Sequence, residues 1–349
     1  MTNSNALPVM ARDQQQTHDN QQAHNRLQSL FYKNSIETTE LKTFLTQLKP
    51  IIEDELEILL QDQRRKGQKE SKDLETLFEA MSYATLGNGK RLRAFLFLAT
   101  CYSLGYEFSC GNINKDLLKI CCALECLHAY SLIHDDLPGM DNSPLRRGKP
   151  STHKAFNHHT AILSGSALQN LGFEILLSLN FKAEDKVELT KILLQKTGSL
   201  GMMGGQQLDM DYEVSCQTVP TKNIETMLHM KTGAFFQACV LMAWRLFKNK
   251  HLSSSPIRES LEQFAYHFGL LFQLTDDLLD TTKKKIGKPT QQDSNKSTYT
   301  TLHGEAFTKT EIKKHTSQCL QHLENLAPSA DTSTTLLKKL VHFVKTREA

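Results

Sequence analysis

Apolar residues recur at intervals of three and four positions along most of the chain, which is the period of amphipathic α-helices. Leu41, Phe44, Leu45 and Leu48 show this pattern first, and Pro50 is expected to break or kink the helix that they begin. Strict alternation of apolar and polar residues, the mark of a half-buried strand, is nearly absent. The pattern therefore predicts an all-α fold, with more and longer helices than a four-helix bundle needs.

Further helices are expected wherever the pattern continues between turn signals. The pattern at 74–81 ends at the glycine-rich turn 87–89, and the helix after it closes at Gly105. Gly204 and Gly205 are expected to mark a break between helices. The remaining helices are predicted over residues 92–104, 115–137, 159–180, 186–203, 222–249, 257–281, 311–326 and 333–346.

The N-terminal segment differs in composition from the rest of the chain. Residues 1–35 are rich in Gln, Asn, His and Ser and hold few apolar anchors, so we expect a disordered tail there. No shift in composition divides residues 36–349, which we expect to form one domain.

Composition and charge exclude several classes of function. No apolar run is expected to approach the length of a membrane span, so stable membrane insertion is not expected. The net charge of +3 is too small for a nucleic-acid footprint. The eight cysteines form no CxxC pair and several lie in apolar helical stretches, which indicates small buried side chains in a reducing cytoplasm.

Three carboxylates, Asp135, Asp136 and Asp141, close the long apolar helix predicted over 115–137. A regular helix would place Asp135 and Asp141 on opposing faces, but Pro138 lies between them and disrupts the hydrogen-bond ladder. We expect a local break that swings Asp141 back toward Asp135. Because carboxylate oxygens are ligands that Mg2+ prefers, the motif is a candidate metal site.

A second acidic motif, with Asp276, Asp277 and Asp280, closes the helix predicted over 257–281. Asp276 and Asp280 are four residues apart, so they project from one helix face, one turn above the other. Like charges at that spacing destabilise a bare helix, and negative charge near a helix C-terminus opposes the dipole. A divalent cation would offset both costs, whereas two merely solvated helix ends would leave them unexplained.

Basic residues accompany both acidic motifs. Arg146 and Arg147 follow the first, and the planar fork of arginine binds phosphate oxygens bidentately. Lys90 and Arg93 begin a helix after a glycine turn, where cations oppose the dipole and are better explained by an anionic ligand. Lys231 interrupts an apolar helix, and alone it would be a snorkelling surface residue. Acidic and basic clusters together suggest Mg2+ and a phosphorylated substrate.

Two further signals are weaker. His128 lies seven residues before Asp135 on the same helix face, where core packing and a ligand role are equally open. The lysine-rich segment 283–296, which includes Lys288 and Lys296, contains a glycine and a proline that fit a loop closing over a site. A run of lysines is, however, usually only solvated.

The ordered set of motifs resembles the trans-isoprenyl diphosphate synthases, and most closely the bacterial short-chain farnesyl diphosphate synthase type. The resemblance covers about residue 40 to the C-terminus and implies an all-α isoprenoid synthase fold, a large helical bundle around a deep central cavity. It also implies a homodimer. The motifs are Gly-Lys-Arg-Leu-Arg at 89–93, the acidic motif at 135–141 with its two arginines, Gly-Gly-Gln at 204–206, Lys-Thr-Gly at 231–233 and Asp-Asp-Leu-Leu-Asp at 276–280.

The resemblance implies a Mg2+-dependent condensation of isopentenyl diphosphate with dimethylallyl or geranyl diphosphate to give farnesyl diphosphate. Magnesium, as three ions per site, would be held by Asp135, Asp141 and Asp276, with Asp136, Asp277 and Asp280 in support. The allylic diphosphate would be contacted by Arg146, Lys231 and Lys288. Isopentenyl diphosphate would be bound by Lys90, Arg93, His128 and Arg147. Thr232 and Gln273 would lie near the carbocation, and Lys296 on the closing loop.

The length of the product depends in this family on the residue five positions before the first acidic motif. Here it is Tyr130, about 7.5 Å deeper along the helix than Asp135. A bulky ring at that depth would end the cavity after a short chain and favours a C15 product, unless Tyr130 only packs in the core. Asn88, Ala94 and Ser166 depart from the residues usual in the family, and the loop after Asp280 is shorter than usual.

Four alternatives remain open. A geranylgeranyl diphosphate synthase differs in product length alone. A terpene cyclase normally carries an Asn/Ser/Glu type of second motif, whereas residues 276–280 form a full aspartate motif. A metal-dependent phosphohydrolase built on His134 and Asp135 lacks suitably placed further histidines. A non-catalytic helical scaffold would not need two intact acidic motifs.

Overall fold

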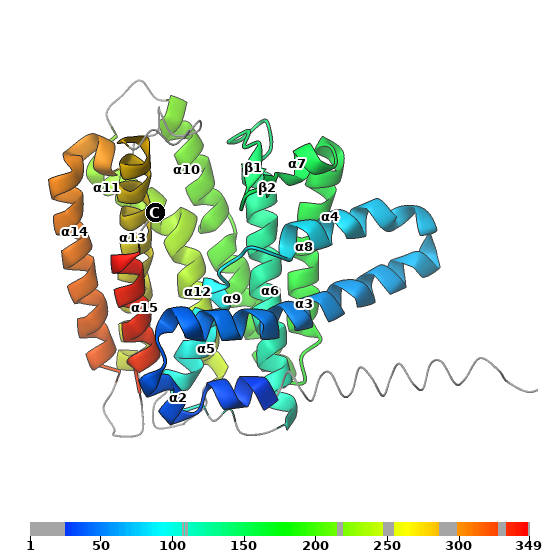
Figure 1. Cartoon of the computed structure of the whole chain (residues 1–349), viewed down its shortest axis with the longest axis horizontal. Helices are drawn as coiled ribbons and strands as arrows, with labels where there is room; N and C mark the ends of the chain where they lie inside the picture. Colours follow the sequence, from blue (N-terminus) through cyan, green and yellow to red (C-terminus); the bar gives the residue numbers. More distant parts are fainter. Residues whose placement is uncertain are drawn as a thin grey trace, which may run out of the picture.

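The computed structural model describes residues 25–106, 108, 111–214, 219–246, 255–285, 299–326 and 333–347. Within these ranges the chain is a bundle of helices, and its only strands, β1 (Leu145–Arg146) and β2 (Lys149–Pro150), form a short antiparallel hairpin (Figure 1). The prediction of an all-α fold is confirmed. The helices are α2 (Lys33–Thr38), α3 (Leu41–Glu70), η1 (Lys72–Leu74), α4 (Glu75–Thr85), α5 (Leu92–Ser103), α6 (Gly111–Asp135), α7 (Thr152–Ala155), α8 (His158–Leu177), α9 (Ala183–Thr197), α10 (Met202–Val214), α11 (Thr221–Leu228), η2 (His229–Gly233), α12 (Ala234–Leu246), α13 (Ser255–Lys285), α14 (Tyr299–Glu324) and α15 (Thr335–Thr346).

The helices that carry the acidic motifs are linked through a series of packed helices. α6 packs against α5 and α8, α5 packs against α12, and α12 packs against α13, which in turn packs against α14. Their apolar faces form one continuous core that includes Phe95, Phe97, Phe235, Phe236 and Phe268. In Figure 1, α6 and α13 run in the same direction, so their C-terminal ends lie at the same end of the bundle.

Residues 25–35 belong to the folded bundle, contrary to the expectation that a disordered tail extends to residue 35. Residues 25–30 are helical, and Leu27, Leu30 and Phe31 are buried. Phe31 stacks on Phe108, with ring centroids 4.0 Å apart. Apolar side chains at positions i, i+3 and i+4 thus anchor a segment that is polar on average. Residues 1–24 lie outside the described part of the chain.

Two expected breaks in helices are absent. α3 continues through Pro50, because the proline removes a single N–H donor while the buried face continues with Leu48, Ile51 and Ile52. The two glycines at 204 and 205 lie inside α10.

The helix predicted over 186–203 divides earlier, between α9 and α10. The need for glycine at 205 comes from packing, since a Cβ on Gly205 would collide with the backbone nitrogen of Lys231. Gly205 therefore allows α10 to approach the segment that carries Lys231.

Among the described residues, one helix is long and apolar enough to cross a membrane by length and composition, namely Lys115–Asp135 within α6. The expectation that no apolar run approaches that length is therefore wrong. In the structure 72% of this window is buried against other helices, as in the core helix of a bundle. The six cysteines that the structure describes as free thiols are also buried, as expected.

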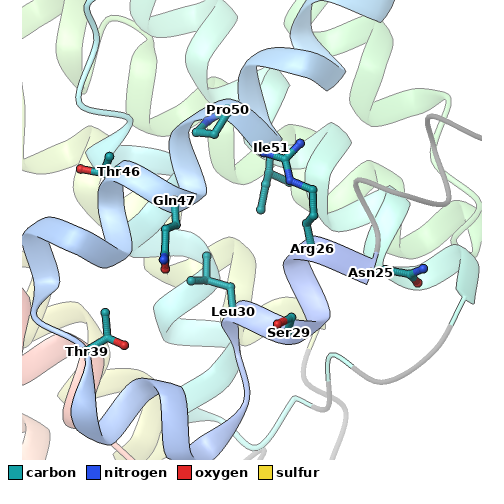
Figure 2. A pocket seen from close by; sticks show the side chains of 9 residues that line it. All are labelled: Asn25, Arg26, Ser29, Leu30, Thr39, Thr46, Gln47, Pro50 and Ile51. Atoms are coloured by element: carbon teal, nitrogen blue, oxygen red, sulfur yellow. The ribbon is translucent and has the colours of Figure 1, made fainter.

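An open pocket of about 760 Å3 lies between residues 25–30 and α3 (Figure 2). Its lining is largely uncharged and includes Ser29, Thr46 and Gln47. Arg26 also lines it, and its guanidinium is paired with Asp54 at 3.0 Å. This pocket therefore lacks the cluster of charged groups that would mark a site of chemistry.

Histidines join α13 to α14. Nδ1 of His267 and Nδ1 of His315 lie 2.9 Å apart, and the ring of His322 stacks on His267. At that separation one nitrogen must donate and the other must accept, so the accepting ring must be neutral. Burial, His315, His322 and Lys314 lower the pKa of His267 to about 4.

We expect acid to weaken folding through this contact. Because the folded pKa of His267 lies below its ordinary value of 6.5, its contribution is complete above that pH and is lost as the pH falls toward 4. Because His267 is only partly buried and solvent screens its charge, the loss should be about 1 kcal/mol, measured by urea denaturation at neutral pH and about pH 4.5. His267→Leu should flatten this pH dependence, whereas His342→Gln, at an exposed site on α15, should keep it. An unchanged dependence in His267→Leu would contradict the assignment.

Candidate active site

α6 ends at Asp135, and the chain then turns back on itself. The backbone N–H of Asp141 donates to the carbonyl oxygen of Asp135 at 2.9 Å, so the return lies beside the helix end. Burial raises the pKa of Asp135 to about 6; Lys231 opposes this rise and Asp141 adds to it. The chain thus brings Asp141 back beside Asp135, as expected from Pro138, which lies between them.

The hairpin after this motif presents two arginines. Nε of Arg146 donates to both carboxylate oxygens of Asp136, at 3.0 and 3.1 Å. Arg147 and Gly148 form the hairpin turn with φ of +53° and +78°, a conformation that costs an arginine more than a glycine. A Cβ on Gly89 would lie 2.9 Å from Nη1 of Arg147, so the glycine turn before α5 packs directly on this arginine.

The second acidic motif lies on α13, where Asp276 is paired with Arg347. Nη2 of Arg347 lies 2.8 Å from Oδ1 of Asp276 and donates to the carbonyl oxygen of Phe272 at 2.6 Å. Burial raises the pKa of Asp276, while Arg347 and Lys90 oppose that rise. Asp277 accepts a hydrogen bond from the backbone N–H of Tyr299 at 3.3 Å. Arg347 was not expected in the site, since it is an isolated arginine beyond the last helix.

Lys231 lies in η2, a π-helical segment between α11 and α12. Such single turns are frequent at functional sites. Its ammonium group pairs with Asp209 of α10, and its charge opposes the rise in the pKa of Asp135. Lys231 is therefore a residue of the site and not a snorkelling surface lysine. Asp209 was missed, because the spacing of charges within α10 does not show which helix lies opposite.

The same segment also contacts α13. Thr232 Oγ1 donates to Oε1 of Gln273 at 3.0 Å. A Cβ on Gly269 of α13 would collide with Gly233, so a pair of glycines lets the two backbones approach closely. This contact holds η2 beside the helix that carries the second acidic motif.

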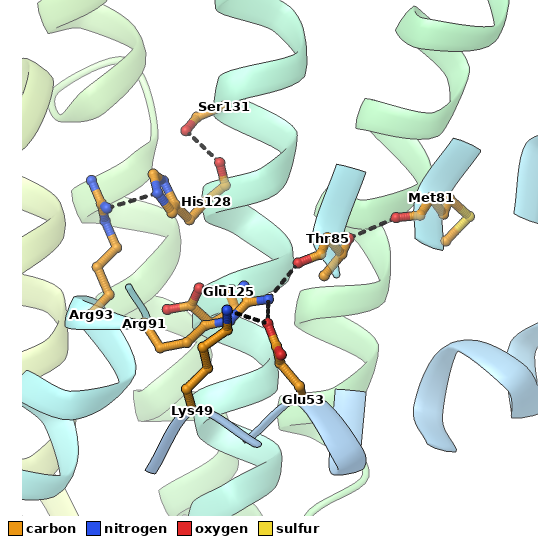
Figure 3. A network of polar contacts seen from close by, with 9 residues as sticks. All are labelled: Lys49, Glu53, Met81, Thr85, Arg91, Arg93, Glu125, His128 and Ser131. Atoms are coloured by element: carbon orange, nitrogen blue, oxygen red, sulfur yellow. Dashed lines mark hydrogen bonds and ion pairs between the residues drawn. The ribbon is translucent and has the colours of Figure 1, made fainter. Parts of the chain in front are cut away.

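Arg93 and His128 form a buried cationic cradle between α5 and α6 (Figure 3). Nη1 of Arg93 lies 3.1 Å from Nε2 of His128. Because a guanidinium can only donate, Nε2 accepts and the imidazole proton is on Nδ1. Burial and the charge of Arg93 lower the pKa of His128, so the ring is neutral. Among the described residues neither Nε of Arg93 nor Nδ1 of His128 has a hydrogen-bond partner, which leaves two buried donors for an acceptor.

Arg91 supports this cradle from within the core (Figure 3). Its Nη1 donates to Glu125 at 3.0 Å, and its Nη2 donates to Glu53 at 2.7 Å and to the carbonyl oxygen of Thr85 at 2.8 Å. Its φ of +53° places it in the left-handed region at the start of α5. Three hydrogen bonds thus hold a strained residue between Lys90 and the helix that carries Arg93.

Residues of the basic segment 90–93 interact electrostatically with both acidic motifs. Lys90 lies close enough to Asp276 to lower its pKa, and Asp135 lies close enough to Arg93 to raise the pKa of the arginine, against the effect of burial. Charges within the segment 90–93 therefore act on both acidic motifs.

The carboxylates fit a hard divalent cation by their chemistry. In the described part of the chain no three Asp, Glu, His or Cys side chains already converge to hold an ion. Arginines instead stand beside two of the carboxylates, Arg146 at Asp136 and Arg347 at Asp276, which shows that these positions attract cations. The first motif lies at the end of α6, whereas the second lies inside α13, which continues to Lys285 and is not closed by Asp280 as expected. The carboxylate oxygens of both motifs match the preference of Mg2+ for oxygen ligands.

Three other residues predicted for the site are Tyr130, Lys288 and Lys296. Tyr130 is buried, and its ring lies edge-on to His134 with centroids 4.9 Å apart. Burial raises the pKa of Tyr130, and the charge of Asp135 adds to that rise. Lys288 and Lys296 lie outside the described residues.

An all-α bundle in which two helices carry acidic motifs beside a basic cradle has the architecture of the isoprenoid synthase fold. A family model for polyprenyl synthetase matches residues 74–340. The chain belongs to this polyprenyl synthetase family, and it is a trans-prenyltransferase of the farnesyl diphosphate synthase type.

Relatives and solved structures agree with that assignment. The chain is 38% identical over 278 residues to a farnesyl diphosphate synthase of Haemophilus influenzae, an alignment that covers 78% of this chain and 89% of the relative. An apo FPP/GFPP synthase structure from Zymomonas mobilis superposes with a TM-score of 0.74 at 32% identity, covering 88% of this chain and 99% of that one. A geranyltransferase from Helicobacter pylori, complexed with magnesium and isoprenyl diphosphate, has a TM-score of 0.66 at 31% identity and covers 77% and 87%.

Proposed function

We propose that the protein is a Mg2+-dependent farnesyl diphosphate synthase, which condenses isopentenyl diphosphate with dimethylallyl or geranyl diphosphate to give (2E,6E)-farnesyl diphosphate. The observation that carries the proposal is that charges within the segment 90–93 act on both acidic motifs. Positive groups for diphosphates and oxygen ligands for metal thus belong to one site.

The metal would be Mg2+, at three ions per site. Asp135 and Asp141 would hold it from the end of α6. Asp276 would hold it from α13 after its ion pair with Arg347 has opened. Asp136, Asp277 and Asp280 would support these ligands. The magnesium bound in the related Helicobacter pylori structure supports the choice of ion.

The substrates would divide between the two cationic groups. Arg146, Lys231 and Lys288 would contact the allylic diphosphate beside the first acidic motif. Arg93 and His128 would offer their unpartnered donors to isopentenyl diphosphate, together with Lys90 and Arg147. Thr232 and Gln273, which bond to each other, would line the path of the carbocation, and Lys296 would close over the site.

The reaction breaks the allylic C–O bond, and the diphosphate leaves with the electron pair. Bound Mg2+ would supply the charge that stabilises this leaving group. Lys231 and Arg146 add fixed positive charge on the same side, where the negative charge develops. The π electrons of isopentenyl diphosphate then form the new C–C bond, and a proton is lost to the departing diphosphate.

The test is an incubation of the full chain with Mg2+, isopentenyl diphosphate and geranyl diphosphate, followed by chromatography of the dephosphorylated products. A C15 alcohol that disappears when EDTA is added is the expected result. A C20 alcohol would instead identify a geranylgeranyl diphosphate synthase. Phosphate release without chain growth would identify a hydrolase, and no turnover would refute the proposal.

Product length should depend on Tyr130. Its buried ring lies in the same helix as Asp135, one to two turns earlier, where a growing chain would meet it. Tyr130→Ala is expected to shift the product distribution from C15 toward C20 and longer chains, measured by the same chromatography. Tyr130→Phe, which keeps the ring, should leave the C15 product in place. An unchanged distribution in Tyr130→Ala would show that Tyr130 is only a core residue.

We further propose a cytoplasmic homodimer. The exposed apolar residues Ile162 and Leu163 of α8 and Val187 and Leu194 of α9 lie on helices that pack together, and Leu200 follows at 89% exposure. A second copy of the chain would cover these side chains. Light scattering should give a dimer mass, and Leu163→Glu should shift it toward the monomer; a monomeric wild-type chain would refute this assembly.

A further inference from the structure

Three histidines lie together where α13 packs against α14, two helices that Figure 1 shows side by side. His315 and His322 are seven residues apart on α14, so they share one helix face. His267 of α13 contacts both: its Nδ1 lies 2.9 Å from Nδ1 of His315, and its ring stacks on that of His322 with centroids 5.7 Å apart. His267 is nine residues before Asp276, about 13.5 Å of helix rise, so the cluster lies apart from the second acidic motif.

A carboxylate faces the other nitrogen of His315. Nε2 of His315 lies 3.7 Å from Oε2 of Glu311, one helical turn earlier on α14. That carboxylate favours the tautomer with the proton on Nε2, so Nδ1 of His315 carries the lone pair and His267 donates to it. The ammonium group of Lys314 lies 2.7 Å from the same carboxylate, which compensates its charge. Histidines that bind metal ions are oriented in this way, by a carboxylate at the nitrogen opposite the ion.

The two facing imidazoles are in the form that binds metal. Burial lowers the pKa of His267 to about 4 and also lowers the pKa of His315, and Lys314 adds to both effects, so the rings are neutral near pH 7. A bound ion holds histidine nitrogens at about 2.0–2.1 Å, so two nitrogens 2.9 Å apart would subtend about 90° at the ion. Neighbouring ligands in square-planar or octahedral coordination make this angle, which suits Cu2+ and Ni2+.

We propose that Nδ1 of His267 and Nδ1 of His315 form a binding site for a divalent transition-metal ion of the Ni2+ or Cu2+ type, which joins α13 to α14. On binding, the proton on Nδ1 of His267 passes through solvent to Nε2, so that both Nδ1 atoms present lone pairs. The χ2 torsion of histidine is soft, which lets both rings turn toward one ion. Water would hold the remaining positions, because no three donor side chains already converge in the part of the chain that the structure describes.

This site is independent of the proposed catalysis. Mg2+ prefers oxygen ligands, whereas imidazole nitrogen suits the later transition metals, so the two sites would select different ions. His267 is only partly buried, which leaves the site accessible to an ion from solvent. Because the ion would bind two helices that pack together only in the folded chain, it should stabilise the fold.

The test is calorimetric titration of the full chain with Ni2+, in buffer with excess Mg2+ to occupy the aspartate motifs. The wild-type chain is expected to bind Ni2+, and its melting temperature should rise. His267→Gln should weaken this binding by at least about tenfold and remove the rise in melting temperature. Glutamine keeps a polar group that can still donate a hydrogen bond to His315, so the variant should fold.

The matched control is His158→Gln, His159→Gln, which removes two exposed histidines from the start of α8. This control should bind Ni2+ like the wild type, and the site is refuted if His267→Gln does so too. Electron paramagnetic resonance of the wild-type chain with one equivalent of Cu2+ is a test that needs no variant. Coupling to two imidazole nitrogens is expected, and a spectrum of oxygen ligands alone would overturn the assignment.

Discussion

Asp135→Asn is expected to lower kcat by on the order of 10³-fold while leaving the fold intact. Asparagine keeps the size of the side chain but removes the charge that burial, Asp136 and Asp141 make costly in the free protein. A carboxylate held at such a cost has a strong affinity for a cation, and it acts where the departing diphosphate gains charge. Losing it should therefore raise the barrier of the chemical step more than it weakens substrate binding.

Two measurements check this result. Steady-state kinetics should show the loss mainly in kcat, and the shift in melting temperature caused by Mg2+ with inorganic diphosphate should decrease. Asp73→Asn, at an exposed position in η1, is the matched control and should change neither. A kcat for Asp135→Asn within about tenfold of the wild type would contradict the role of Asp135 as a ligand.

The features that could be predicted from the sequence are those set by local geometry. The return of Asp141 to Asp135 agrees with the position of Pro138, whose ring and missing N–H favour the end of a helix. Helix periodicity located α6 and α13 because each buries an apolar face along most of its length. The motif order then indicated the family. In all these cases the deciding interactions lie within a few residues of one another.

The features that could not be predicted depend on which helices become neighbours. Asp209 meets Lys231 across two helices, and Arg347 reaches Asp276 from beyond the last helix. The π-helical turn at Lys231 and the tight contact of Gly205 with it are equally non-local. A helical period shows that a face is buried but not what covers it. Pairings between distant segments of this site therefore required the structure.

Glu125→Gln is expected to lower the free energy of unfolding by about 3 kcal/mol, because it leaves the buried guanidinium of Arg91 with one carboxylate instead of two. The side chains of Arg91 and Glu125 are 2% and 1% exposed, so water cannot replace the lost charge. Urea denaturation measures the change. Glu57→Gln, at an exposed position on α3, is the control and should have little effect.

The same substitution should raise KM for isopentenyl diphosphate more than it lowers kcat. The charge of Glu125 acts on Arg93 and Arg147 as well as on Arg91, so its removal weakens both the charge balance of the cradle and the support that Arg91 gives it. Arg91→Met, Glu125→Met separates the two effects, since removing both buried charges should restore much of the stability. If Arg91 positions Lys90 and Arg93, KM should stay high in this double variant. Recovery of KM together with stability would show that the ion pair supports only the fold.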